Sequence, residues 1–210
     1  MLPPNLSGFV LAGGKSTRMG RDKATLALDG RTLLEHAIAV LRGVVDEVCI
    51  LGSQQLYSGY DAPVIEDIYP GCGPLGGIHA ALTHTKRTFN LIIAVDTPFL
   101  APAFLSFMAE RAMNTRAVVT TPEIAGFRQP LCSVYSREFL AIAEAALQPR
   151  RSQRNTGKSK DFKIVPLFPE PGTLVITEPQ MAKFAFTPEM FENLNTPEDL
   201  ERARRRDMKA

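Results

Sequence analysis

Short apolar runs alternate with helical spacings along the first 121 residues of this 210-residue chain. Apolar runs bounded by turn residues are typical of buried strands, and apolar residues three or four apart are typical of helices. The runs predict strands at residues 9–11, 24–30, 47–51, 63–67, 91–95 and 117–121. The spacings predict helices at 33–42, 74–82 and 102–113. Such an alternation indicates right-handed βαβ units and a parallel sheet.

The second half of the chain has a less regular pattern. It predicts a strand at 130–135, a helix at 137–147, and strands at 162–167 and 173–177 near an edge of the sheet, where prolines lie close by. A final helix is expected after Thr196, with Pro197 at its first position. A chain of this length has enough residues for a single domain with a substantial core, so we expect one domain over residues 1–210.

A glycine-rich loop follows the first predicted strand. It combines glycines with cationic residues, namely Gly13, Gly14, Gly20, Lys15, Arg18 and Lys23. Glycine lets backbone N–H groups approach a ligand closely, and successive N–H groups in a turn form an anion site. Arg and Lys add positive charge for phosphates. This composition is typical of a loop that binds polyphosphates.

The same loop contains Gly14-Lys15-Ser16, which ends like the P-loop pattern G-x-x-x-x-G-K-[ST]. A P-loop would need glycine at position 9, where this chain has Phe9, and Gly8 is one residue out of register. The spacing therefore argues against an ordinary P-loop.

Two carboxylates follow predicted strands. Asp67 ends the run at 63–67, and Asp96 comes directly after the run at 91–95. Ligands collect at the carboxyl ends of parallel strands, so both should lie at the same sheet edge as the loop. Asp96 is a candidate ligand for Mg²⁺, which bridges carboxylates to substrate phosphates; the alternative is a helix cap or turn. Asp67 is a candidate for nucleotide binding or for the same metal ion.

Residues 71–77 form a second glycine-rich stretch, Gly-Cys-Gly-Pro-Leu-Gly-Gly, at the start of a predicted helix. Its glycines would allow close approach of a base or ribose, or they would serve helix-to-sheet packing alone.

These parts support an in-line transfer. An acceptor phosphate oxygen would attack the α-phosphorus of a nucleoside triphosphate, and pyrophosphate would leave. The reaction needs alignment and cations rather than a covalent nucleophile. Arg18 and Lys23, together with Mg²⁺, are the candidate cations.

Composition limits the other classes of function. The formal charge is +2, with 45% hydrophobic and 22% charged residues, which gives no bias toward nucleic acid or membranes. No apolar run approaches a membrane span, and the first residues do not resemble a signal peptide, so we expect a cytoplasmic protein. The cysteines, Cys49, Cys72 and Cys132, indicate neither a disulfide framework nor a zinc site. Cys49 and Cys132 are expected to be buried.

The spaced motifs resemble the molybdenum cofactor guanylyltransferase family. They are Leu11-Ala-Gly-Gly…Arg-Met-Gly…Asp-Lys23, Glu66-Asp67, Gly73-Pro-Leu-Gly-Gly-Ile78, Asp96-Thr-Pro-Phe99, Gln129-Pro130 and Asn195-Thr-Pro-Glu198. The resemblance implies a three-layer, mostly parallel Rossmann-like sheet of the nucleotide-diphospho-sugar transferase type. It also implies a nucleotide-binding half at about 1–121 and an acceptor-binding half at about 122–210.

The same resemblance implies a reaction and a set of site residues. GTP and molybdenum-bound molybdopterin would be the substrates, and molybdopterin guanine dinucleotide and pyrophosphate the products. A molybdoenzyme or its chaperone is a candidate partner for product delivery. The implied nucleotide contacts are Leu11, Ala12, Gly13, Gly14, Lys23, Asp67 and Asp96, with Mg²⁺ at Asp96.

Three alternatives remain open: a cytidylyltransferase acting on the same pterin, a sugar-phosphate nucleotidyltransferase, and a nucleotide-binding partner protein without turnover. Some family members have a nucleotide-binding asparagine after the second strand, where this chain has Leu51-Gly-Ser53. The basic segment 149–163 contains Arg150, Arg151, Arg154 and Lys158, which would attract an anionic acceptor or form a solvated loop.

Overall fold

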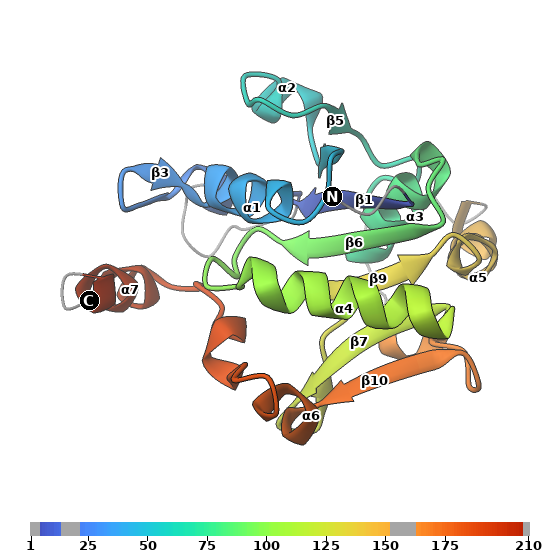
Figure 1. Cartoon of the computed structure of the whole chain (residues 1–210). Helices are drawn as coiled ribbons and strands as arrows, with labels where there is room; N and C mark the ends of the chain where they lie inside the picture. The colour runs from blue at the N-terminus through green and yellow to red at the C-terminus, as the bar shows by residue number, and fades with distance from the viewer. Residues whose placement is uncertain (1–4, 14–21, 152–162, 208–210) are drawn as a thin grey trace.

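A central sheet organises the chain, of which the computed structural model describes residues 5–13, 22–151 and 163–207. Its strands are β1 (Leu6–Leu11), β4 (Val48–Leu51), β5 (Val64–Ile65), β6 (Phe89–Ala94), β7 (Val119–Ile124), β8 (Phe127–Arg128), β9 (Cys132–Ser136) and β10 (Thr173–Thr177). The strand order is β10-β7-β9-β6-β1-β4-β5, and β8 pairs with β7 (Figure 1). A separate hairpin joins β2 (Ala27–Leu28) to β3 (Arg31–Thr32).

Most neighbouring strands of the large sheet are parallel. β6, β1, β4 and β5 form one parallel group, and β7 and β10 form a second parallel pair. Between these groups, β9 runs antiparallel to both β6 and β7. The mostly parallel sheet is therefore confirmed. The strand expected at 130–135 is an antiparallel strand in its interior.

Helices cover both faces of this sheet. The helices are α1 (Leu33–Arg42), α2 (Gln54–Tyr57), α3 (Pro74–His84), α4 (Pro102–Thr115), α5 (Phe139–Arg151), α6 (Glu178–Ala182) and α7 (Pro197–Asp207). Helices α1 and α4 lie on one face, and α3 and α5 lie on the other (Figure 1). This arrangement confirms the predicted three-layer α/β fold.

The alternation of side chains along the central strands builds two cores. Val10 of β1 and Leu91 of β6 belong to the cluster beneath α1 and α4. Phe9 and Ile92, one residue away in each strand, belong to the cluster beneath α3 and α5. Because successive side chains of a strand point to opposite faces, apolar residues at consecutive positions are what a sheet buried on both faces requires.

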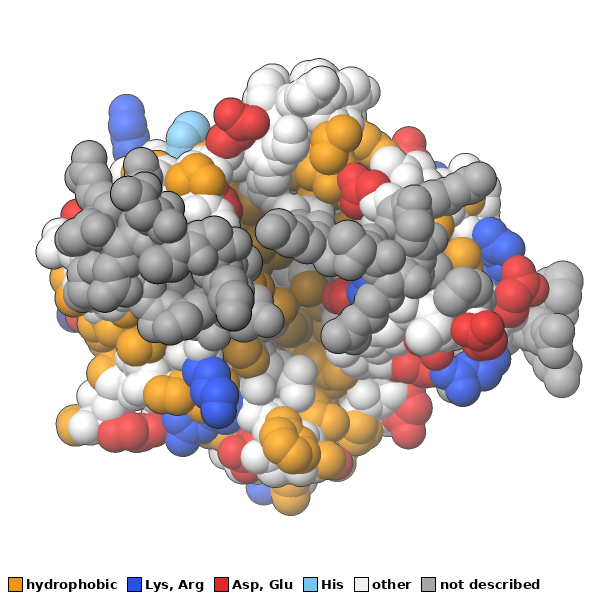
Figure 2. Space-filling model, turned by 180° about the vertical axis from the view of Figure 1, so that it is seen from behind, with side chains coloured by type: hydrophobic (Ala, Val, Ile, Leu, Met, Phe, Trp, Pro, Cys, Tyr) orange, Lys and Arg blue, Asp and Glu red, His pale blue; other side chains and the backbone are white. Residues whose placement is uncertain are grey.

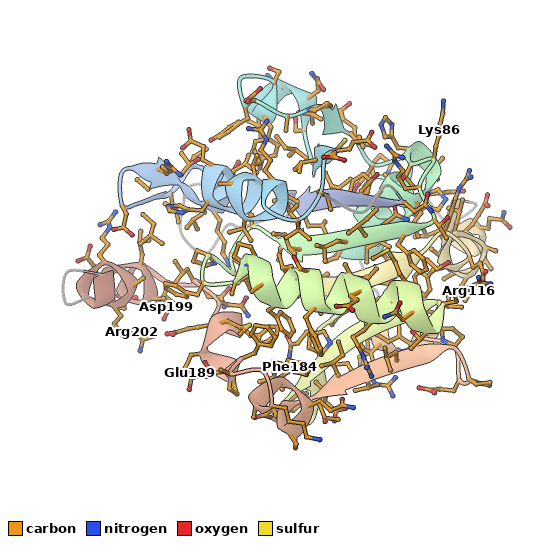
Figure 3. The ribbon with its side chains drawn as sticks, viewed as in Figure 1. Lys86, Arg116, Phe184, Glu189, Asp199 and Arg202 are labelled. Atoms are coloured by element: carbon orange, nitrogen blue, oxygen red, sulfur yellow. The ribbon has the colours of Figure 1, made fainter. Side chains whose placement is uncertain are left out.

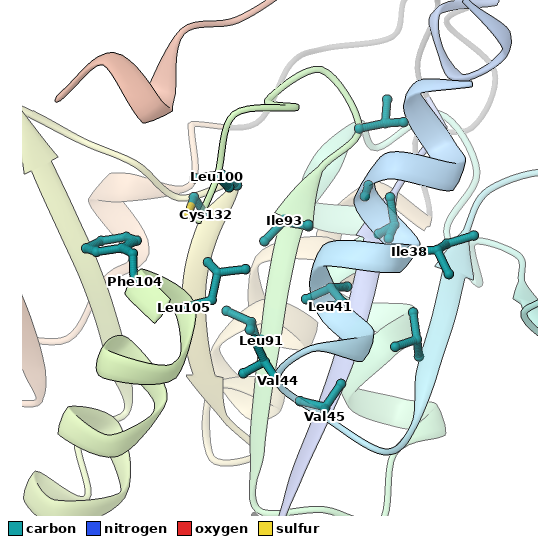
Figure 4. Packing of buried hydrophobic residues seen from close by; sticks show 14 of the residues in the cluster. Ile38, Leu41, Val44, Val45, Leu91, Ile93, Leu100, Phe104, Leu105 and Cys132 are labelled. Carbon is teal, nitrogen blue, oxygen red and sulfur yellow. The ribbon is translucent and has the colours of Figure 1, made fainter. Parts of the chain in front are cut away.

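Figure 4 shows the first of these clusters from close by. Ile38 and Leu41 from α1 and Leu105 from α4 pack over Leu91 and Ile93 of β6. These five side chains are at most 5% exposed, so this face of the sheet is dry. The sheet edge that carries the polar motifs is therefore held by a rigid apolar layer.

Local signals define several helix starts. Thr32 accepts from the backbone N–H of Glu35 at 3.2 Å, and the Glu35 carboxylate accepts from the backbone N–H of Thr32 at 2.7 Å, so the two residues form a capping box at the start of α1. Pro74 and Pro102 begin α3 and α4, where a missing N–H removes no helical hydrogen bond.

Two predicted strands are wrong in part. Residues 24–30 were expected to be a strand, but Lys23–Thr25 form a 3-10 turn, η2, because the Asp22 carboxylate accepts from the backbone N–H of Ala24 at 3.0 Å. The Asp29-Gly30 turn that follows is present. Of the run at 162–167, residues Val165–Leu167 form a second 3-10 turn, η4, with a proline in its first turn.

Two cysteines and one histidine are buried in or beside these apolar layers. Cys49 and Cys132 are buried, as predicted, and burial raises the pKa of the Cys49 thiol to about 11. His79 lies on α3 and is buried against Tyr69. None of the helices in the described part of the chain is long and apolar enough to cross a membrane.

Candidate functional site

The carboxyl ends of four strands lie level with one another. The parallel register aligns Leu11 of β1 with Leu51 of β4 and with Ala94 of β6, and it aligns Leu51 with Ile65 of β5. The residues that leave these strands are therefore neighbours at one edge. The start of the glycine-rich loop, Asp67 and Asp96 share this edge, as the sequence predicted.

Backbone hydrogen bonds fix the first residues of the loop. The N–H groups of Ala12 and Gly13 both donate to the Leu51 carbonyl at 3.0 Å, and the N–H of Val95 donates to the Leu11 carbonyl at 3.1 Å. These donors are engaged within the sheet edge. Contacts of Ala12 and Gly13 with a ligand would therefore use their other atoms, and the anion-binding N–H groups would come from the residues that follow.

Lys23 and Asp96 meet above this edge. The Lys23 ammonium lies 3.2 Å from the Asp96 carboxylate and donates to the Asn195 side-chain oxygen at 2.6 Å. The Lys23 and Asp96 side chains are 17% and 23% exposed, so a ligand can reach them. Lys23 ends the motif that begins at Leu11, and Asp96 begins the motif that follows β6. The fold therefore brings these two motifs into contact.

A segment near the C-terminus completes this group. The N–H of Leu194 donates to the backbone carbonyl of Asp96 at 2.9 Å. Asp199 of α7 accepts from the N–H groups of Asn195 and Thr196, and these bonds, the Asn195 one first, lower the pKa of its carboxyl. Asp199 also pairs with Arg202, labelled beside it in Figure 3. Asn195 begins the Asn-Thr-Pro-Glu motif, and the motif by itself predicts no role for its side chain.

Tyr57 is a residue of this edge that sequence reasoning missed. Its side chain is 2% exposed, and its hydroxyl lies 3.1 Å from the Ala12 carbonyl and 2.7 Å from the Asp22 carboxylate. Gly52 makes room for the ring, because a Cβ at position 52 would lie 2.6 Å from Tyr57 Cε2. The departure from the family's asparagine, at Leu51-Gly-Ser53, thus includes a glycine that Tyr57 requires.

Asp67 lies between β5 and the first turn of α3. Burial raises the pKa of its carboxyl above the usual range. A Cβ at Gly76 would lie 3.2 Å from its Oδ2, and a Cβ at Gly77 would lie 2.8 Å from Leu11 Cδ2. These two glycines therefore let α3 pack directly on Asp67 and β1, which supports the packing role considered for the second glycine-rich stretch.

Asp67 and Asp96 leave different strands of the edge. β1 and β4 lie between β5 and β6, a separation of roughly 14 Å at the usual strand spacing. This order favours separate roles for the two carboxylates over a metal ion shared by both.

Several predicted residues fall outside the described ranges. Gly14 and Arg18 are among them, and so are Arg154 and Lys158 of the basic segment. Their roles stay predictions.

One group of potential metal ligands is present among the described residues away from this edge. Glu47, Cys49 and His84 place one ligand atom each within 4.8 Å of one another. They lie at the amino end of β4, and Glu47 already accepts from the Ser7 hydroxyl at 3.0 Å. At the carboxyl edge, the candidate ligand for a cation is Asp96.

The side of the molecule opposite α4 is hollowed near its middle (Figure 2). Figure 2 shows a hollow near its middle with hydrophobic side chains on the floor. Concave surfaces of this kind are where small molecules bind.

Comparison with known proteins identifies the family. The model of the MobA-like NTP transferase domain matches residues 8–161. The chain belongs to the MobA-like NTP transferase family.

Individual relatives agree with this assignment. A probable molybdenum cofactor guanylyltransferase of Carboxydothermus hydrogenoformans is 31% identical over 94% of each chain. A molybdenum cofactor guanylyltransferase of Desulfosudis oleivorans is 32% identical over 94% of each chain. The crystal structure of molybdopterin-guanine dinucleotide biosynthesis protein A from Archaeoglobus fulgidus superposes with a TM-score of 0.80 at 25% identity, covering 97% of this chain and all of that one.

The family recognised from the motifs is thus confirmed, and so is the nucleotide-diphospho-sugar transferase type of fold. Within this MobA-like transferase, the geometry adds Tyr57, Gly52 and Asn195 to the candidate site. Tyr57 follows Gly52 by five residues, and this spacing by itself predicts no function. Only the folded chain brings the Tyr57 hydroxyl next to Ala12 and Asp22.

We expect Gly52→Ala to destabilise this MobA-like transferase by about 1–3 kcal/mol, because the added methyl group overlaps the Tyr57 ring. Urea unfolding would measure the loss. Gly59→Ala is the matched control, since a Cβ there meets nothing within 4 Å. Equal unfolding free energies for the two variants would contradict this reading of the Tyr57 packing.

We expect Asp67→Asn to stabilise the ligand-free protein at pH 7. The folded-state pKa of Asp67 is raised, so the stability linked to its proton is present below the unfolded value of about 4 and is lost as the pH rises through the folded value. Asparagine carries no charge to desolvate. The gain in melting temperature should shrink as the pH falls toward about 4.

Thermal unfolding across this pH range tests the effect, with Asp46→Asn at an exposed position as the control. A melting temperature for Asp67→Asn that equals the wild-type value at every pH would mean that the buried charge of Asp67 does not destabilise the folded protein.

Proposed function

We propose that this chain transfers the GMP group of GTP to molybdenum-bound molybdopterin. The products are molybdopterin guanine dinucleotide and pyrophosphate. The names of its relatives support this substrate pair. The observation that carries the proposal in the structure is the meeting of Lys23 and Asp96, 3.2 Å apart, at the carboxyl edge of β1 and β6.

The reaction needs a cation near the phosphates and a carboxylate beside it. An oxygen of the pterin phosphate forms a bond to the α-phosphorus of GTP, and the bond from that phosphorus to the bridging oxygen of pyrophosphate breaks. Lys23 holds its charge at the edge where the predicted triphosphate loop ends. Its ammonium stabilises negative charge that develops on the transferred and leaving oxygens. Asn195 accepts from the same ammonium and orients it.

Asp96 fits a magnesium ion. Its half-buried carboxylate offers oxygen ligands of the kind that Mg²⁺ prefers, with one oxygen paired to Lys23. When bound, the ion would neutralise phosphate charge and orient the triphosphate. Leu194 donates to the backbone carbonyl of Asp96, so the strand end that presents the carboxylate is held in place.

Asp67 and the loop supply the remaining contacts. Asp67 is desolvated at the first turn of α3, where a donor group of the nucleotide would offset the cost of its buried charge. Leu11, Ala12 and Gly13 are the proposed nucleotide contacts at the end of β1. Gly14 and Arg18 belong to the loop that follows in sequence, and Arg18 is the proposed second cation of the transfer.

Pyrophosphate release tests the proposal. With Mg²⁺ present, we expect release from GTP and molybdopterin, and little from CTP, ATP or UTP, or with a sugar phosphate as acceptor. Chelation of the divalent ion should abolish it. Preference for CTP would instead indicate a cytidylyltransferase. Turnover with a sugar phosphate as acceptor would indicate a sugar-phosphate nucleotidyltransferase, and nucleotide binding without pyrophosphate release would indicate a nucleotide-binding partner protein.

We expect Asp96→Asn to lower kcat by about a hundredfold or more, because it removes the charged ligand while keeping the shape of the side chain. The optimum Mg²⁺ concentration should rise. Steady-state pyrophosphate release over a Mg²⁺ titration would measure both effects.

Asp61→Asn is the matched control, since the Asp61 side chain is 93% exposed and pairs with Arg42. Circular dichroism should show both variants folded. Wild-type turnover in Asp96→Asn would overturn the assignment of the metal to this residue.

A further inference from the structure

Tyr57 contacts the chain on both sides of the glycine-rich loop. Its hydroxyl lies 3.1 Å from the carbonyl of Ala12, which leaves β1, and 2.7 Å from a carboxylate oxygen of Asp22, which precedes η2. Ala12 and Asp22 are ten positions apart in sequence. One buried hydroxyl therefore contacts both Ala12, which precedes the loop, and Asp22, which follows it.

The packing leaves this hydroxyl little freedom. The Tyr57 ring is 2% exposed and rests on Gly52, where no Cβ fits. Tyr60 packs edge-on against it, with ring centroids 6.3 Å apart. Burial first, and then the bond to Asp22, raise the pKa of the Tyr57 phenol above its usual value, so the group stays protonated and donates. The single hydroxyl hydrogen is shared between the Asp22 carboxylate, the nearer acceptor, and the Ala12 carbonyl, so this rigid group holds both acceptors close to it.

Asp22 transmits that position to Lys23. One Asp22 carboxylate oxygen accepts from Tyr57, and the other accepts from the N–H of Ala24 at 3.0 Å, which starts the 3-10 turn that contains Lys23. Both oxygens of the carboxylate thus have donors. Without the Tyr57 hydroxyl, one oxygen would lose its donor next to Lys23, where its negative charge would compete with phosphates for the same cations.

We propose that Tyr57 is a positioning residue that ties Ala12 to Asp22, and so prepares this edge to bind the nucleoside triphosphate. The inference rests on the proposed function, because it takes the ligand at this edge to be a nucleoside triphosphate. It assigns Tyr57 an effect on nucleotide affinity and none on the acceptor.

Tyr57→Phe tests the inference because it removes the hydroxyl and keeps the ring on Gly52. The lost bond has a charged acceptor, so we expect the KM and the dissociation constant for GTP to rise about tenfold. The KM for molybdopterin should stay within about twofold, and kcat should change less than the KM for GTP, because Lys23 keeps its bonds to Asp96 and Asn195.

Tyr60→Phe is the matched control. It removes a hydroxyl from the neighbouring tyrosine, whose hydroxyl has no hydrogen-bond partner within the described ranges, and its GTP affinity should equal that of the wild type. Calorimetric titration with GTP gives affinities that do not depend on turnover.

Asp22→Ala provides a second route to the same bond. It should weaken GTP binding, and adding Tyr57→Phe to it should weaken binding little further, since the two residues share one interaction. This pair keeps the inference testable if Tyr57→Phe alone unfolds.

The outcomes separate the two proposals. Unchanged GTP affinity in a folded Tyr57→Phe protein, or a lower melting temperature with unchanged affinity, would overturn the positioning role and leave the proposed function standing. Additive losses in the double variant would also overturn it. Wild-type protein that binds GTP but transfers nothing would overturn the proposed function alone, and wild-type protein that binds no nucleoside triphosphate would overturn both.

Discussion

The parallel register of β1 with β4 and β6 is the constraint on which the candidate site depends. It aligns Leu11 with Leu51 on one side and with Ala94 on the other. Because these strands end level, the backbone of Ala12 bonds to Leu51 and that of Val95 to Leu11. Polar residues that follow different strands then lie beside one another. A slip of one residue would turn every side chain of a strand to the other face and dissolve this edge.

Close packing of large side chains against glycines shapes this sheet edge. Gly52 admits the Tyr57 ring, and Gly77 admits the Leu11 side chain beneath α3. In both places the missing Cβ lets a large side chain approach the backbone, so glycine serves packing as much as backbone conformation. The charged residues use the same frame. The Lys23 ammonium donates to Asp96, which follows β6, and to Asn195, which precedes α7.

The C-terminal segment makes the site depend on the whole fold. Leu194 bonds to the backbone of Asp96, while Asp199 organises Asn195 and Thr196. The match to the Carboxydothermus hydrogenoformans relative covers 94% of the chain, in keeping with a site assembled from both ends of the sequence. The antiparallel β9 joins the two parallel groups of strands, so the part of the chain after residue 121 belongs to the same sheet as the part before it. The expected division into nucleotide-binding and acceptor-binding halves stays a prediction.

Local patterns alone determined much of this protein. The apolar runs predicted most strands of the large sheet, and the motif spacing indicated the family and placed the loop and Asp96 at one edge. These signals are readable because each depends on residues close in sequence. The tertiary structure alone decided that β9 is antiparallel, that Tyr57 reaches Ala12 and Asp22, and that Asn195 reaches Lys23. The hydrogen bonds of Tyr57 and Asn195 join residues from 35 to 172 positions apart, and the energy of such a contact has no trace in the local pattern of either partner.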